Sequence, residues 1–561
     1  MPKATRAAMN LVVLCGFTSI IITTVCAAVA FKSANILFLL PVPSSSHRLW
    51  NNVLIEALEE RGHNLTILTV ETERSRRNVT YICMKKIYES LNEFYYSEND
   101  DVGAAMVNRK SSFKIIKENY QLGNFVSRKI SESDGLQKLL DYPKTFKFHA
   151  IIFDYSMAQS LLALVAHFNF PPLISISPQL QPMRFTAASS TPLFPSYISH
   201  YSTMSTTKSL REKLNERFLN GFIYHTFDWF YGKFIYMKNE NRRAMKILGE
   251  KNHSEKLTIS LEQLEYSDLV LVNRNFAFDD VLPLPPNVVP VAGLQAQRKN
   301  EIQNHDVIEF VEKSEKPIIL FTMGSSMLAE DLGYEIMHEV MNAFQKLLND
   351  FNVICKCNEK FIRKFSQPQN VLYVEWMQQN ELLANRKVRL IVSHGGMLTI
   401  QEAIWHEKPI LGMPIQIEHQ RNIERAIELG FAESINFENF TAIEMAIKIR
   451  QLIESPIYRN SIRKASKLMK SRPMMPKETA IYWIEQVLEH KGLKHLHFEA
   501  RKLSFYKLYN IDIISIIVII LLIYILIMQY HFIKEWLLKK NEETAVRKDK
   551  VMNEIDKLKN E

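Results

Sequence analysis

Short runs of consecutive apolar residues alternate with longer amphipathic segments in the first half of the chain. RLWNNVLIEALEERG, which Gly62 ends, has apolar positions at helical spacing. The apolar runs are NILFLL from Asn35, LTILTV from Leu65, AIIFD from Ala150, PLISIS from Pro172 and LVLVN from Leu269. Runs that are apolar throughout are typical of parallel strands covered by helices on both faces. The pattern therefore predicts a doubly wound α/β domain.

The same alternation restarts after a proline-rich stretch, DDVLPLPPNVVPVAG, at residues 279–293. The later runs are PIILFTMG from Pro317, NVICKC from Asn352, VLYVEW from Val371, RLIVSHGG from Arg389 and PILGMP from Pro409. We therefore expect a first domain at residues 31–285, a linker at 286–300 and a second α/β domain at 301–476. Ligands of such sheets bind outside the carboxyl ends of the strands, which points to the cleft between the domains.

Two other apolar stretches have the character of membrane segments. Residues 1–30 combine Lys3 and Arg6, an apolar stretch at 11–25 and the small residues AAVA, which is typical of a cleaved signal peptide. Residues 509–530 are apolar over a length that can span a bilayer. We expect a juxtamembrane segment at 477–508, a cytosolic tail at 531–561 and a luminal bulk, as in a single-pass type I membrane protein.

Composition and charge narrow the class of protein further. The 561 residues are 47% hydrophobic and 23% charged, which fits a folded chain, and the formal net charge is +9. The Lys and Arg residues are spread along the sequence and several flank the membrane-type segments, so we do not expect nucleic-acid binding.

Signals for location and modification lie near the C-terminus and in four sequons. The last five residues, KLKNE, place Lys557 and Lys559 at the spacing of a dilysine endoplasmic-reticulum retrieval signal, although a solvated charged tail is the alternative. Sequons that permit luminal glycosylation begin at Asn64, Asn78, Asn252 and Asn439.

The segment RLIVSHGGMLTIQEAIWH indicates a diphosphate site. A strand is predicted to end at His394, and Gly395 and Gly396 allow close approach to the backbone before a helix begins near Thr399. The first turn of that helix directs free N–H groups and the positive end of its dipole at the same place. In the alternative interpretation, Thr399 and Glu402 form only a capping box and the glycines only a turn.

Two further side chains are candidates for holding a base. Trp376 ends the VLYVEW run and Gln379 follows three residues later. At the rim of a nucleotide cleft, the indole of Trp376 can stack on a base and the amide of Gln379 can form hydrogen bonds with the edge of that base. In the alternative interpretation Trp376 is part of the core, as a tryptophan at a strand end usually is.

The first domain contains a candidate general base. In FLLPVPSSSHRLW, His47 follows a predicted strand and lies near a helix N-terminus, whose dipole disfavours imidazolium. Asp154, at the end of AIIFD, can orient the imidazole through its second ring nitrogen. The structural alternative makes His47 a residue of a helix cap and Asp154 a cap at a strand end.

The block from 376 to 422, W-M-Q-Q-N-E-L-L … S-H-G-G-M-L-T-I-Q-E-A … P-I-L-G-M-P … E-H-Q-R-N, closely resembles the signature of membrane-bound animal UDP-glycosyltransferases. PSSSHRLW, FTMGSS and the C-terminal anchor extend the resemblance over nearly the whole chain. It implies a GT-B fold with the UDP-sugar in the second domain and the acceptor in the first. It also implies a helix at about residues 477–489 that crosses back towards the first domain.

The resemblance also implies roles for individual residues. It places Trp376 on uracil, Gln379 on the base or ribose and Glu402 on the ribose hydroxyls. It assigns the diphosphate to His394, Thr399 and neighbouring amides such as that of Gly396, with Ser325 near the phosphates. No metal and no cofactor beyond the UDP-sugar co-substrate are expected, which agrees with a sequence that has no D-x-D motif.

The loop PIQIEHQRN departs from the family pattern. Family members usually carry Asp-Gln where this chain has Glu418 and His419, and Gln420 follows one residue late. Because the usual pair binds hydroxyls of the transferred sugar, we expect a neutral hexose donor, galactose or glucose. Glucuronate is disfavoured because its carboxylate would meet that of Glu418.

The function expected from these features is inverting transfer of a hexose to a hydroxyl of a small lipophilic acceptor, with His47 as base. The alternatives are a UDP-glucuronosyltransferase of the same architecture, a non-catalytic lipophile carrier on this fold and a nucleotide-sugar epimerase. The sequence does not decide between a monomer and a homo-oligomer.

Overall fold

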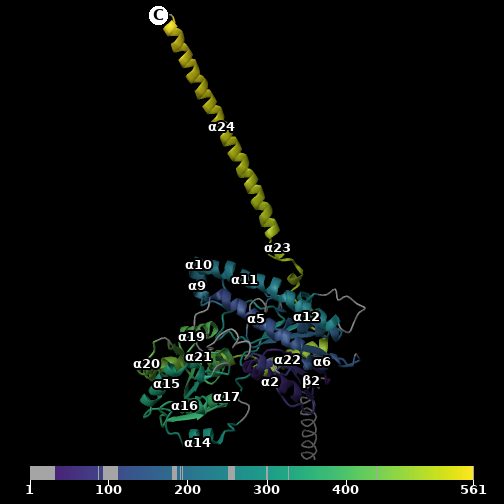
Figure 1. Ribbon diagram of the computed structural model, residues 1–561, viewed down its shortest axis with the longest axis vertical. Helices are drawn as coiled ribbons and strands as arrows, with labels where there is room; N and C mark the ends of the chain where they lie inside the picture. Colours follow the sequence, from purple (N-terminus) through teal and green to yellow (C-terminus); the bar gives the residue numbers. More distant parts are fainter. Residues whose placement is uncertain are drawn as a thin grey trace, which may run out of the picture. The chain divides into compact units, whose positions relative to one another are not determined.

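The computed structural model describes residues 32–85, 87–91, 111–143, 145–179, 186, 188–189, 191, 194–249, 260–297, 301–325, 328–436 and 439–559. The predicted signal peptide and the sequon at Asn252 lie outside these residues. Two compact units are present, one ending at His497 and the other formed by Phe498–Glu561. The first contains two parallel sheets, so the predicted pair of doubly wound α/β domains is confirmed (Figure 1).

The first sheet has the order β3-β2-β1-β4-β5-β6-β7, and all its named pairs are parallel. Its central strands coincide with the apolar runs of the sequence, because strands covered on both faces bury every side chain. The strands are β1 (Asn35–Leu40), β2 (Asn64–Thr69), β3 (Val79–Cys83), β4 (Ala150–Asp154), β5 (Leu173–Ser177), β6 (Leu269–Val272) and β7 (Val288–Pro290).

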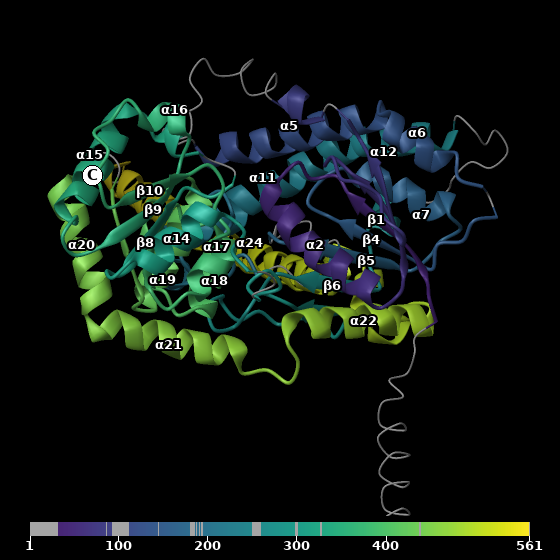
Figure 2. The same ribbon diagram turned by 90° about the horizontal axis from the view of Figure 1, so that it is seen from below.

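Alternate residues of β1 enter different cores on the two faces of this sheet. Ile36 and Phe38 pack with α2 (Ser45–Glu60), whereas Leu37 and Leu39 pack with helices on the opposite face. Those helices are α5 (Ser112–Ser131), α6 (Asp134–Leu140), α7 (Ala163–His167), α12 (Met237–Gly249) and α13 (Leu261–Leu264), with the 3₁₀ turn η1 (Gln159–Leu162). Figure 2 shows the strands between these two layers.

A further run of helix precedes α12. It consists of α9 (Thr207–Glu212), α10 (Leu214–Phe218), α11 (His225–Phe230) and two π-helical segments, η2 (Leu219–Tyr224) and η3 (Tyr231–Tyr236). Figure 1 shows α9, α10, α11 and α12 in a row along the outside of this unit.

The second sheet has the order β10-β9-β8-β11-β12-β13 and is also parallel. Its strands are β8 (Ile318–Thr322), β9 (Asn352–Lys356), β10 (Val371–Val374), β11 (Val388–Ser393), β12 (Ile410–Gly412) and β13 (Ala432–Ser434). The helices are α14 (His305–Lys313), α15 (Tyr334–Lys346), α16 (Glu359–Ile362), α17 (Gln379–Ala384), α18 (Met397–Trp405), α19 (Ile417–Glu428), α20 (Ala442–Glu454) and α21 (Pro456–Lys470), with the 3₁₀ turn η4 (Ala329–Leu332).

Three short strands have no counterpart among the predicted runs. β3 and β7 are the two edge strands of the first sheet, and β13 is one edge of the second. β7 lies within residues 286–300, the predicted linker. Because β7 pairs with β6, the first sheet continues to Pro290. An edge strand is covered less than a central one and needs fewer apolar residues. The hydrophobic pattern of the sequence therefore does not reveal β3, β7 and β13.

Helix α22 (Pro476–His490) lies where the resemblance places a crossing helix. Ile481, Ile484 and Val487 are buried in one core with Trp50 of α2 and Leu269 of β6. Residues that follow the second sheet in sequence therefore complete the core of the first (Figure 2).

The second compact unit is mainly one helix. After η6 (Glu499–Lys502) and α23 (Phe505–Leu508), α24 runs from Ile511 to Lys559. By length and composition it can cross a membrane, and its most apolar 18-residue window has a mean hydropathy of 3.2. The predicted span at 509–530 lies almost entirely in this helix, which continues through the predicted tail.

Candidate active site

The candidate residues of the first domain lie where the strand order of its sheet reverses. β1 and β4 are neighbours, and the chain leaves them towards opposite edges of the sheet. Loops after such strands diverge and open a crevice at their carboxyl ends. His47 stands in the first turn of α2, which follows β1, and Asp154 is the last residue of β4.

The structure brings His47 and Asp154 together. The His47 Nδ1 atom lies 2.6 Å from Asp154 Oδ2, and both side chains are buried. The other carboxylate oxygen accepts hydrogen bonds from the Ser156 amide at 3.2 Å and the Ser156 hydroxyl at 2.7 Å. Ser177 Oγ, at the end of β5, lies 2.9 Å from Ser156 Oγ. Because Nδ1 is occupied, Nε2 is the ring nitrogen available for proton transfer.

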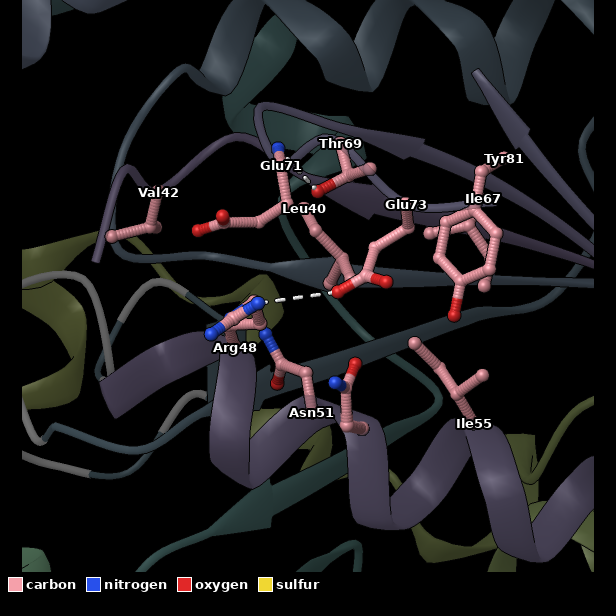
Figure 3. A pocket seen from close by; sticks show the side chains of 11 residues that line it. Leu40, Val42, Arg48, Asn51, Ile55, Ile67, Thr69, Glu71, Glu73 and Tyr81 are labelled. Carbon is pink, nitrogen blue, oxygen red and sulfur yellow. Dashed lines mark hydrogen bonds and ion pairs between the residues drawn. The ribbon is translucent and has the colours of Figure 1, made fainter. Parts of the chain in front are cut away.

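Next to His47 in the chain, Arg48 and, one turn further along α2, Asn51 face the ends of β1 and β2 (Figure 3). Arg48 Nη1 donates to Glu73 Oε1 at 3.2 Å, and the hollow around this pair has a volume of about 10 Å³. That volume suits one water molecule and no sugar or acceptor. The pair therefore connects α2 to the loop after β2 beside the candidate base.

In the second sheet the strand order reverses between β8 and β11, as it does between β1 and β4 in the first. His394 follows β11, is buried, and its ring fills the space in front of two glycines. A Cβ atom on Gly324 would lie 2.3 Å from the His394 ring, and one on Gly396 would lie 2.6 Å from it. Gly324 also has a φ of +89°, which favours glycine. Ser325, partly buried, continues the loop after β8.

Helix α18 begins directly after Gly395 and Gly396. Gly396 is its N-cap residue, and its first backbone bond runs from the Ile400 amide to the Gly396 carbonyl. The amides of the first turn are therefore free of intrahelical partners, as an anion site at a helix N-terminus requires.

The capping-box alternative for Thr399 and Glu402 is wrong, because α18 starts two residues before Thr399 and no side chain caps it. Instead, both side chains bind Gln379, the first residue of α17. Gln379 Nε2 donates to Glu402 Oε2 at 2.6 Å and to Thr399 Oγ1 at 3.2 Å. The three candidate residues form one hydrogen-bonded group.

Burial sets the ionisation of this part of the site. Desolvation raises the pKa of Glu402 to about 8, although the hydrogen bond from Gln379 opposes the shift. Burial, with smaller effects of His419 and Lys356, holds the pKa of His394 well below its usual value. His394 is therefore a neutral imidazole at physiological pH, so its ring can offer a ligand an N–H hydrogen bond but no positive charge.

Trp376 follows β10 and is not a core residue. Its side chain is 51% exposed, and the Nζ atom of Lys356 lies 5.0 Å from the ring centroid. Lys356 Nζ also donates to the Gly324 carbonyl at 2.7 Å. A cavity of about 140 Å³, lined by Gly324, Lys356 and Glu375, lies in this region. The exposed indole is thus available for stacking beside the loop after β8.

Glu418 and His419 occupy the first turn of α19, after β12. The His419 ring is buried and stands edge-to-face against His394, with 4.4 Å between centroids. Desolvation lowers the pKa of His419 to about 4. Its Nδ1 atom accepts from the Gln416 amide at 3.4 Å, which leaves Nε2–H as a donor.

Glu418 connects the second domain to the first. Its Oε2 atom accepts a hydrogen bond from Gln179, which follows β5. Burial raises the pKa of Glu418, whereas Arg421, His47 and Gln179 lower it. Because β5 pairs with β4, the residue that Glu418 binds follows a strand next to the one that ends at Asp154. Arg421 Nη1 makes a second contact of this kind, donating to the His200 carbonyl at 3.2 Å.

Sequence reasoning missed Gln179, Lys356 and Arg421. Lys356 could have been found from the sequence, because it is a charged residue at the carboxyl end of a buried strand. Gln179 and Arg421 could not, since their partners are more than 200 residues away in the chain.

Comparison with known proteins agrees with this geometry. The sequence profile described as "UDP-glucoronosyl and UDP-glucosyl transferase" matches residues 36–544. UDP-glycosyltransferase UGT5 of Dactylopius coccus is 27% identical over 506 residues, which cover 90% of this chain and 92% of that protein. UDP-glucuronosyltransferase 2B9 of Macaca fascicularis is 25% identical, with 84% and 88% covered.

Solved structures support the fold. The glycosyltransferase of kitacinnamycin superposes with a TM-score of 0.52 and 16% identity, covering 81% of this chain and 99% of that one. The spinosyn forosaminyltransferase SpnP also has a TM-score of 0.52, with 13% identity and coverage of 82% and 100%. The architecture is GT-B, as the sequence resemblance implied. The profile match over most of the chain and this fold establish that the chain belongs to the UDP-glucuronosyl and UDP-glucosyl transferase family.

Proposed function

We propose that this glycosyltransferase moves a neutral hexose from a UDP-sugar to a hydroxyl of a small lipophilic acceptor, with inversion and with His47 as base. The observation that carries the proposal is the buried His47–Asp154 pair at the end of β4, next to the strand whose following residue, Gln179, binds Glu418 of the second domain. A base held in one tautomer beside a donor crevice is what glycosyl transfer to an alcohol requires.

In the proposed reaction, His47 Nε2 takes the acceptor proton while the acceptor oxygen attacks the anomeric carbon. The bond from that carbon to the β-phosphate oxygen breaks, and UDP leaves with the electron pair. Attack from the face opposite UDP converts an α-linked donor into a β-linked product. Asp154 stabilises the imidazolium that forms. The amides of α18 and the N–H group of neutral His394 bind the developing charge on the diphosphate, so the proposed steps use no metal and no cofactor.

The nucleoside is assigned to the group at the start of α17. Trp376 stacks on uracil, Gln379 bonds the base or ribose, and Glu402 accepts from the ribose hydroxyls. Thr399, Gly396 and Ser325 surround the diphosphate. Support comes from the exposure of Trp376 and from the hydrogen-bonded group of Gln379, Thr399 and Glu402.

The transferred sugar is assigned to the first turn of α19. Glu418 supplies carboxylate oxygens and His419 an N–H donor in place of the usual Asp-Gln pair, which favours galactose or glucose. Glucuronate would bring a second negative charge to Glu418, a partly buried carboxylate whose pKa is already raised by burial.

The proposed location is the endoplasmic-reticulum membrane, with the catalytic domains in the lumen. It rests on the signal-type N-terminus, the dilysine tail, the sequons and the apolar part of α24. An acceptor hydroxyl on a lipophilic molecule fits an enzyme held at a membrane.

His47→Ala is expected to abolish transfer while UDP affinity stays nearly unchanged, because base and nucleotide lie in different domains. Asp154→Asn should lower kcat by about 10- to 10⁴-fold through loss of the orienting carboxylate. UDP release and UDP titration calorimetry measure the two properties, with His338→Ala as an exposed-histidine control. Substantial turnover by His47→Ala would refute the mechanism.

Trp376→Ala should weaken binding of UDP and of every UDP-sugar alike, by about 1–3 kcal/mol for a lost stacking partner. Calorimetric titration with UDP, UDP-glucose and UDP-galactose measures the effect, and Tyr482→Ala is the exposed-aromatic control on α22. A loss confined to one donor would show that the indole touches sugar instead of uracil.

UDP affinity should rise with pH. Glu402 has a raised pKa in the free protein, and ribose hydroxyls donate to its ionised form, so a proton must leave when UDP binds below pH 8. Between about pH 6.5 and about pH 8.5 the affinity should increase, by at most about tenfold per pH unit. Glu402→Gln should bind more weakly and lose this slope. An unchanged slope in that variant would remove Glu402 from the ribose site.

His419→Gln is expected to shift donor preference towards UDP-glucose, because an amide donor and acceptor replaces an imidazole donor at the sugar hydroxyls. Donor preference is measured as the ratio of initial rates with UDP-glucose, UDP-galactose and UDP-glucuronate, each tested with a panel of phenols and alcohols as acceptors. Gln420→Ala is the control, and the ratio should stay constant in it. If Gln420→Ala changes the ratio and His419→Gln does not, Gln420 is the residue that binds the sugar. If the wild-type enzyme uses UDP-glucuronate alone, the assignment of a neutral hexose is refuted.

A further inference from the structure

A chain of polar contacts leads from the Asp154 carboxylate to the second domain. The Ser156 hydroxyl donates to Asp154, and its oxygen lies 2.9 Å from Ser177 Oγ. Ser177 Oγ accepts from the backbone amide of Gln179 at 3.1 Å, and its one proton has two acceptors, Ser156 Oγ and the Gln179 carbonyl at 2.6 Å. The Gln179 side chain then donates from Nε2 to Glu418 Oε2. These contacts connect the carboxylate that orients the base with the residue assigned to the transferred sugar.

The backbone at Gln179 is anchored, so the sheet sets the position from which its side chain extends. Ser177 is the last residue of β5 and is buried. Asn273, which follows β6, donates from Nδ2 to the Pro178 carbonyl at 2.9 Å. Gln179 itself is exposed, and its side chain extends from this anchored turn to Glu418. The contact therefore has to order one side chain only, because the backbone is already held.

Glu418 can hold the amide of Gln179 and a sugar hydroxyl at the same time. A carboxylate accepts hydrogen bonds at both oxygens, and Gln179 occupies Oε2. Burial raises the pKa of Glu418, and the hydrogen bond from Gln179 is among the contacts that oppose this shift. An ionised carboxylate accepts hydroxyl donors more strongly than a protonated one. Gln179 thus orients Glu418 and favours the form in which it binds a sugar.

Helix α19 makes a second contact with the first domain, which leads to a different group of residues. Arg421 Nη1 donates to the His200 carbonyl at 3.2 Å. The His200 ring contacts the Ser202 hydroxyl and the Asp228 carboxylate, and both of these residues are buried. Arg421 therefore supports the position of α19, whereas the contact of Gln179 continues towards the base.

We propose that Gln179 is a positioning residue of the transfer reaction. From the first domain its amide fixes the Glu418 carboxylate, and the two serines connect the same residue to the carboxylate behind the base. The transferred sugar and the base are thereby held in register, as a near-attack geometry requires. The sugar site then includes a residue of the first domain as well as the first turn of α19. The inference rests on the proposed function, which assigns Glu418 to the sugar and His47 to proton removal.

Gln179→Ala in the full chain should lower kcat/KM for UDP-glucose and UDP-galactose by about tenfold or more, because a hydrogen bond to a carboxylate is lost. Most of the loss should be in kcat and the rest in the affinity for the UDP-sugar, whereas affinity for UDP should stay unchanged, since UDP has no sugar to place. Initial rates and titration calorimetry measure these quantities, and thermal unfolding with and without UDP checks the fold. Gln137→Ala is the matched control, because exposed Gln137 also donates to a carboxylate, that of Asp141 at 2.9 Å.

Exchanging the two groups should restore the contact. Gln179→Glu places two carboxylates together and is expected to be more harmful than Gln179→Ala, and Glu418→Gln removes the carboxylate that binds the sugar. The variant with both changes again pairs one amide with one carboxylate, so its kcat/KM should exceed the product of the two single effects by about tenfold or more. The same exchange at Gln137 and Asp141 should show no such coupling.

The outcomes distinguish this inference from the proposed function. Wild-type kcat/KM in Gln179→Ala, with His47→Ala inactive, would overturn the inference alone, as would single effects that simply multiply in the double variant. A lower donor KM in Gln179→Ala would show that the amide obstructs the sugar and would also overturn it. If His47→Ala retains turnover, the proposed function fails. The affinity for UDP-glucose relative to UDP, which Gln179→Ala should lower, then still decides the role of Gln179.

Discussion

The burial of both faces of two parallel sheets is the constraint on which this structure depends. A strand such as β1 or β11 has no side free for polar side chains, because Leu37 and Phe38 enter different cores. Ionisable groups therefore gather where strands end, and the strand order reverses between β1 and β4 and between β8 and β11, where loops diverge. The candidate base and the candidate diphosphate site occupy these two equivalent places. The repeated topology brings both sets of residues to the ends of parallel strands.

Within the second crevice, burial controls the chemistry of each group. His394 and His419 are neutral because they are packed against each other away from water, and Glu402 has a raised pKa for the same reason. Uncharged buried groups of this kind interact with a ligand through directed hydrogen bonds, which gain strength where water is excluded. The glycines at 324 and 396 make this packing possible, since any larger residue would meet the His394 ring.

The outer helices of the first domain, residues 214–249, are held to it by two kinds of contact. Asn220, Asp228 and Glu240 face inward and are hydrogen-bonded or ion-paired. Tyr236, Ala244 and Ile247 are buried in apolar cores on the same side. The buried polar groups are tolerated there because each one has a partner.

The sequence by itself determined the central strands and the two-domain order. It also placed His47 at the start of a helix and Asp154 and His394 at the ends of strands, because these depend on local periodicity and on short motifs. It did not reveal the edge strands β3, β7 and β13, whose pairing comes from a neighbour rather than from their own apolar content. Tertiary structure alone decided that Gln379 binds both Thr399 and Glu402, that Lys356 lies over Trp376, and that Gln179 meets Glu418. Each of these contacts joins residues from different elements, and no local pattern encodes which side chains the packing of helices on a sheet will bring together.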